Sequence, residues 1–168
     1  MFGRGLPKEV RSRLRIPAGE KVVAWGTGMP GRGVDAAYAV ATDRALYLDA
    51  SGERLPWDRI NRAQWDEPML ELVVLDADGQ PDRLVRVPLG VGSSLPAAVH
   101  AQVTESVIVS ERLQLGDGPG ALAVARRSCD EDAIWWSIVF DAGLDPADAA
   151  LRERADVALA DLRAALGI

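Results

Sequence analysis

The chain has 168 residues, of which 48% are hydrophobic and 26% are charged, and its formal net charge is −6. This length suffices for one ordinary domain with a small extension but not for two full domains, and the composition argues against disorder. The negative charge argues against a nucleic-acid partner, because an acidic protein repels phosphates on average.

The first predicted element is a short helix that begins at Pro7, because Leu6, Val10 and Leu14 recur at four-residue spacing. A glycine-rich connection at residues 26–33 interrupts the strands that follow. We expect extended segments at residues 21–25, 34–41, 45–48, 54–60, 61–66, 70–75 and 83–89. Pro56 indicates an edge position or the start of a strand, since proline cannot donate a ladder hydrogen bond.

A helix over residues 95–106 is predicted next, with Pro96 in its first turn. Three further strands are expected at residues 107–115, 121–126 and 134–140. The last element is a long helix, for which we expect Asp145 as the N-cap and Pro146 in the first turn. Its apolar stripe consists of Leu151, Ala155, Leu159, Leu162 and Leu166.

The order of elements predicts an α+β fold with an antiparallel sheet. We expect a first domain at residues 1–106 and a β-meander with a helix at residues 107–168. That second part is either an extension of the same sheet or a small second lobe.

Two short segments resemble a known family. Residues 41–47 read Ala-Thr-Asp-Arg-Ala-Leu-Tyr, and residues 55–60 read Leu-Pro-Trp-Asp-Arg-Ile. This pattern is similar to bacterial pleckstrin-homology-like (PH-like) and GRAM-type domains, over about residues 17–106. The resemblance implies an antiparallel β-sandwich or barrel capped by a helix, and a scaffold for binding.

The resemblance does not predict a phosphoinositide ligand. Lipid-binding members of that family use clustered lysines and arginines around the first hairpin. Here the corresponding connection offers only Arg32, with Lys21 on the preceding strand. Most of the 19 basic residues are arginines, as is typical of high-GC bacterial genomes, so each one is weaker evidence for phosphate binding.

An alternative function is nucleotide or phosphate binding at the glycine-rich connection. Gly26, Gly28 and Gly31 match a G-x-G-x-x-G pattern after an apolar run, and Asp49 follows at a distance suited to a ribose contact. However, no alternation of strands and helices follows, and a doubly wound sheet would need it.

We find no catalytic or metal-binding constellation. His100 is the only histidine and Cys129 the only cysteine, whereas a thiol nucleophile needs a base and an orienting group, and zinc needs about four ligands. The acidic residues 130–132 lack the spacing of a calcium loop. The sequence therefore predicts a non-enzymatic protein without a cofactor or metal.

The sequence also indicates location. It lacks a signal-peptide run and any apolar stretch long enough for a membrane helix, and a single cysteine forms no internal disulfide. We expect a cytoplasmic protein without integral membrane association. The basic residues among positions 1–21 leave peripheral attachment to anionic membranes as a weaker alternative.

Adjacent Trp135 and Trp136 must point to opposite faces of a strand. One of them is expected in the core, and the other against the long helix, a partner or solvent. The favoured function is thus a PH-like interaction module that binds a protein partner or itself, through a sheet edge or this aromatic pair.

Overall fold

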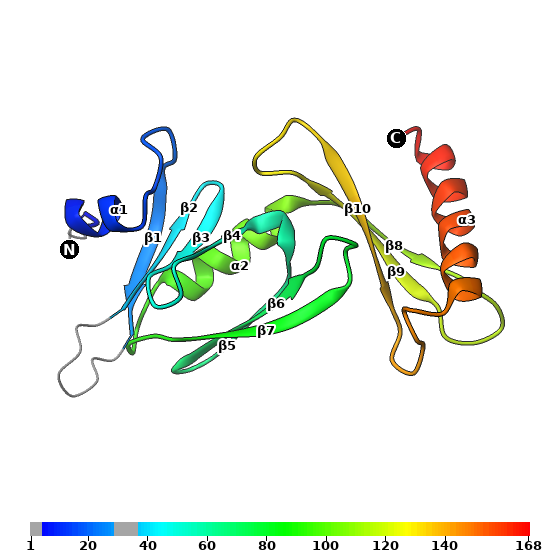
Figure 1. Ribbon diagram of the computed structural model, residues 1–168, viewed down its shortest axis with the longest axis horizontal. Helices are drawn as coiled ribbons and strands as arrows, with labels where there is room; N and C mark the ends of the chain where they lie inside the picture. Colours follow the sequence, from blue (N-terminus) through cyan, green and yellow to red (C-terminus); the bar gives the residue numbers. More distant parts are fainter. Residues whose placement is uncertain (1–4, 29–36) are drawn as a thin grey trace.

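The computed structural model describes residues 5–28 and 37–168. Within these residues, three helices and three antiparallel sheets form an α+β fold, as the sequence predicted, and the strands do not close into a barrel (Figure 1). We call residues 5–28 and 37–106 the N-terminal unit, and residues 107–168 the C-terminal unit. Residues 34–36 and most of the glycine-rich connection lie outside the described residues.

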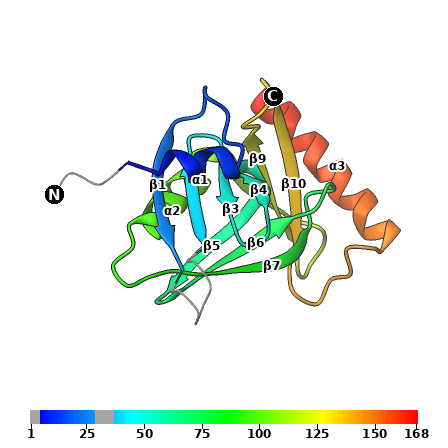
Figure 2. The same ribbon diagram turned by 60° about the vertical axis from the view of Figure 1, so that its left-hand side comes forward.

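The first sheet has the order β1-β2-β3-β4 and consists of β1 (Val22–Thr27), β2 (Tyr38–Thr42), β3 (Ala45–Leu48) and β4 (Glu53–Pro56). Helix α1 (Lys8–Arg13) lies against one face of it (Figure 2). As expected from the spacing, Val10 is buried there, with Leu6 and Leu14 packed beside it. The other face contributes Leu46 and Leu48 to a second apolar core, so both faces of this sheet are covered.

The second sheet has the order β5-β6-β7 and consists of β5 (Ile60–Asp66), β6 (Met69–Leu75) and β7 (Pro81–Pro88). The single extended segment expected at residues 54–60 is wrong, because the 3-10 turn η1 (Trp57–Arg59) interrupts it. Buried Trp57 donates its indole N–H to the Thr42 carbonyl at 3.0 Å, which fixes the corner between the sheets. Pro56 lies on an edge strand, as predicted.

The first two sheets share one apolar core with helix α2 (Leu95–Ser106), whose bounds match the prediction. Leu95, Val99 and Val103 project from α2 into this core. Because the three side chains follow a four-residue spacing, one stripe of the helix closes the space between the sheets.

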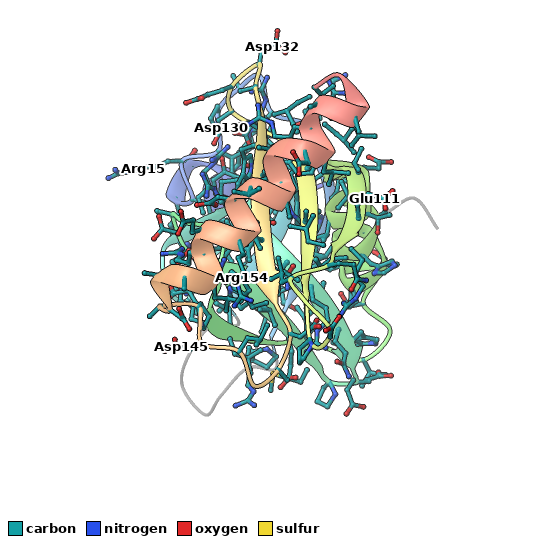
Figure 3. All side chains as sticks on the ribbon, turned by 90° about the vertical axis from the view of Figure 1, so that its right-hand side faces the viewer. Arg15, Glu111, Asp130, Asp132, Asp145 and Arg154 are labelled. Carbon is teal, nitrogen blue, oxygen red and sulfur yellow. The ribbon has the colours of Figure 1, made fainter. Side chains whose placement is uncertain are left out.

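The C-terminal unit has a separate sheet of order β10-β9-β8, which consists of β8 (Val107–Leu113), β9 (Ala121–Arg127) and β10 (Ile134–Phe140). Helix α3 (Ala149–Leu166) crosses one face of this sheet (Figure 3). Ala121 and Ala123 of the sheet share a core with Ala155 of the helix, so small side chains allow a close approach. Leu166, predicted in the apolar stripe, is 43% exposed.

The expected N-cap of α3 is also wrong by three residues. Asp148, rather than Asp145, accepts hydrogen bonds from the backbone N–H groups of Ala150 and Leu151. Asp145 accepts instead from the N–H of Ala147, and its carbonyl accepts from the N–H of Asp148. These bonds form a separate turn before the helix.

Candidate functional site

An open groove of about 330 Å³ runs along β7. Residues 83–88 of β7 form one wall, and the ends of the two hairpins of the first sheet form the other. The first-sheet lining is mostly small or apolar and consists of Gly28, Ala37, Tyr38, Ala39, Leu48, Ala50, Ser51 and Glu53. The groove is thus an apolar trough between two sheets.

The free edge of β7 follows from its place in the second sheet. β7 pairs with β6 on one side and is the terminal strand of the sheet. Val87 is buried in the shared core, whereas Leu84 is 47% exposed. An unpaired edge beside an apolar groove presents a template on which an extended segment can add as a further strand.

Ion pairs lie at the rim of the groove. Arg83 donates to Glu53 of β4 at 2.5 Å, and Arg86 donates to Glu71 of β6 at 2.8 Å. Both arginines are largely exposed, so each pair contributes less than about 1 kcal/mol. Because their charges are matched within the chain, the groove favours a peptide over a phosphate group.

The structure places Gly26 and Gly28 at the end of β1. A Cβ at Gly26 would lie 2.7 Å from the Ser93 Oγ, and one at Gly28 would lie 3.2 Å from the Pro88 carbonyl oxygen. Close packing thus accounts for both glycines. Gly31 and Arg32 lie outside the described residues.

The geometry around these glycines does not match a dinucleotide site. β1 and β2 are antiparallel, whereas that site needs a parallel β-α-β unit. Asp49, the expected ribose contact, accepts two hydrogen bonds from Arg13, at 2.9 and 2.6 Å. The Arg13 guanidinium lowers the pKa of Asp49, which is therefore engaged as an ionised carboxylate.

Trp135 and Trp136 lie on opposite faces of β10, as the sequence predicted. Trp136 packs with the apolar cluster under α3. Trp135 faces the N-terminal unit, where its indole N–H donates to Asp58 at 2.9 Å and the Arg59 guanidinium lies 4.1 Å from its ring centroid. Both are half-buried by contacts within the chain.

Asp58, which sequence reasoning missed, is a buried carboxylate where the two units meet. It is 4% exposed and also accepts a hydrogen bond from the Cys129 N–H at 3.2 Å. Its position in η1 brings it against the turn between β9 and β10, and no sequence signal identified it.

A second buried charge, Arg126, was also missed. Arg126 is 2% exposed and donates to the Ser106 hydroxyl at 3.2 Å, while its Nε has no hydrogen-bond partner among the described residues. Burial lowers the pKa of Arg126, and the negative charge of Asp58 opposes that shift. The two groups are therefore electrostatically complementary.

The structure places the titratable candidates apart from any catalytic arrangement. Burial raises the pKa of the Cys129 thiol to about 11, so this thiol is not activated as a nucleophile. His100 lies on the exposed side of α2. Over residues 5–28 and 37–168, no three His, Cys, Asp or Glu side chains gather as a metal-ligand set.

Both arginines of α1 also have partners within the chain. Arg11 donates to the Pro17 and Glu20 carbonyls at 2.7 and 2.9 Å, and Arg13 pairs with Asp49. None of the described helices is long and apolar enough to cross a membrane. No family model, curated protein or solved structure matches the chain.

Proposed function

We propose that the chain is a non-enzymatic interaction module on a PH-like scaffold, and that it binds an extended segment of a partner protein along β7. The order of a four-stranded sheet, a three-stranded sheet and a closing helix supports the scaffold. The core shared by these elements is what a helix-capped sandwich requires.

The unpaired edge of β7 beside an apolar groove is the observation that carries this proposal. Main-chain hydrogen bonds to such an edge supply affinity, and the groove selects alternate side chains of the added segment. The exposed Leu84 side chain offers an apolar contact at the centre of β7. A phosphate ligand would instead need uncompensated cations.

A peptide-display selection on the immobilised full chain tests the proposal. Selected peptides should bind Leu84→Glu about tenfold more weakly than wild type, because the charge desolvates poorly in an apolar groove. Val91→Glu is the matched control, since Val91 is 82% exposed and does not line the groove. Failure to select peptides, or equal binding to both variants, contradicts the proposal.

A second copy of the chain is the alternative partner for the same edge. Light scattering after size-exclusion chromatography at high micromolar concentration distinguishes the two cases. A wild-type dimer that Leu84→Glu converts to monomer assigns the edge to self-association. A wild-type monomer leaves the partner segment as the occupant.

A further inference from the structure

The two units have separate apolar cores. The core between the first two sheets and α2 receives one residue of the C-terminal unit, the partly buried Cys129. Among the described residues, every member of the core between the third sheet and α3 belongs to the C-terminal unit. Polar contacts therefore make a large contribution where the units meet, as in interfaces that open and close.

Four charged residues of the N-terminal unit form what we call the junction surface: Arg44, Arg54, Asp58 and Arg59. It contacts the acidic turn, residues 128–132, between β9 and β10. Figure 3 labels Asp130 and Asp132 of this turn. Arg54 donates to both carboxylate oxygens of Asp130, at 2.8 and 2.6 Å. This two-point contact matches the planar geometry of a carboxylate.

Two residues of the N-terminal unit, Tyr47 and Glu20, hold the Arg54 side chain in place. Its Nε donates to the Tyr47 hydroxyl at 3.0 Å, and its guanidinium lies 3.4 Å from a carboxylate oxygen of the buried Glu20. These contacts orient the guanidinium before any occupant arrives, which reduces the entropy lost on binding. The site is therefore pre-organised for an acidic side chain.

The rest of the junction surface contacts backbone and aromatic groups. Arg44 donates to the Cys129 carbonyl at 3.1 Å, and Asp58 accepts the Cys129 N–H. Asp58 also accepts the Trp135 indole N–H, while Arg59 covers that ring. The surface thus recognises the groups of an acidic segment with a following aromatic residue.

We propose that the junction surface binds an acidic segment of a partner protein, and that the acidic turn is its displaceable resting occupant. Displacement is feasible because Arg54 and Asp130 are 30% and 47% exposed, and such pairs contribute only about 1 kcal/mol or less. The chain passes between the units at a single point, where α2 ends at Ser106 and β8 begins at Val107. The turn can leave the junction surface while the contacts of Gly79 and Gln80 with β10 keep the two units together.

A fluorescent peptide with the sequence of residues 127–136, with its cysteine replaced by serine, is the probe. Asp130→Asn in the full chain weakens the resting contact, so the probe should bind this variant about twofold more tightly than wild type. Glu131→Gln removes the same charge one residue away and should bind as wild type does. Adding Arg54→Gln to Asp130→Asn should abolish the gain.

Hydrogen exchange on the same proteins checks the opening itself. In Asp130→Asn, the amides of the acidic turn should exchange faster while those of β5–β7 keep wild-type rates. Equal probe affinity for wild type and both single variants overturns the proposal, as does faster exchange throughout the chain. Leu84→Glu should not change probe binding, so this result is independent of the groove along β7.

Discussion

The two units bury different kinds of side chain. In the N-terminal unit the fully buried residues include large ones, such as Trp57, Leu46 and Ile60. In the C-terminal unit the buried core residues are leucines and alanines, the large side chains of β10 are only partly buried, and only Leu151 and Ala155 of α3 are buried. Because apolar burial scales with area, the N-terminal unit should be the more stable of the two.

The difference also shows how the units are joined. A large apolar interface would couple their unfolding, whereas a junction rich in charged contacts permits partial opening. The comparison therefore predicts that substitutions in one core leave the other unit folded. Four experiments test this prediction, and the expected effects decrease from the first to the last.

Trp57→Ala should have the largest effect. Trp57 is 1% exposed and holds the corner between the first two sheets. Its loss should lower the free energy of unfolding by about 3–5 kcal/mol, from the cavity and the unsatisfied Thr42 carbonyl. Urea unfolding measures it, with Trp57→Phe as a milder control. A loss below about 1 kcal/mol contradicts the assigned role.

Leu151→Ala should have a smaller and local effect. Leu151 lies on the buried face of α3 and is 4% exposed, and its truncation should cost about 2–3 kcal/mol. Hydrogen exchange should accelerate in β8–β10 and α3 but not in β1–β7. Val157→Ala, at a 59% exposed position, is the matched control and should change little. Equal acceleration in both units would show a single cooperative core.

Asp148→Ala tests the start of α3. Loss of the two hydrogen bonds to Ala150 and Leu151 should cost about 1 kcal/mol. Asp145→Ala removes only the preceding turn contact and should cost less. Thermal unfolding monitored by circular dichroism compares the two, and a larger loss for Asp145→Ala would restore the N-cap predicted from sequence.

Acid should weaken the junction by the smallest amount. Arg54 holds the pKa of Asp130 below its ordinary value, so the folded state favours the ionised carboxylate. This stabilisation is present above the ordinary value of about 3.9 and is lost as the pH falls through the lowered pKa. For an exposed pair it amounts to a few tenths of a kcal/mol.

Below about pH 4, the amides of the acidic turn should therefore exchange hydrogen faster in wild type than the intrinsic pH dependence of exchange predicts. Asp130→Asn has no carboxylate there and should follow the intrinsic dependence alone. An identical excess in both proteins would assign the effect to another group.

Local patterns predicted the elements well where one pattern was unambiguous. The bounds of α2 and β10 match the sequence analysis, since Pro96 marks a helix start and β10 is a continuous apolar run between turns. The pattern failed at η1 and at the start of α3. At η1 the hydrogen bond from Trp57 to the distant Thr42 carbonyl fixes a corner that local spacing does not show. At α3 two nearby aspartates could cap the helix, and the structure uses the second.

The sites were less predictable than the elements. The tryptophan pair was identified because adjacent strand residues face opposite sides, but the partner of Trp135 was not. The groove along β7 requires two sheets to meet, and no residue type marks it. Of the glycine pattern, Gly26 is explained by packing against Ser93.

Spacing and turn residues within a few positions were enough to predict most helices and strands, apart from η1 and the start of α3. Tertiary structure alone decided which charges meet: Asp58 binds the N–H of Cys129 across 71 residues of sequence. In the sequence alone, Asp58 cannot be distinguished from an aspartate in a solvated turn. Asp58 acts in the junction only because folding buries its carboxylate and places hydrogen-bond donors around it.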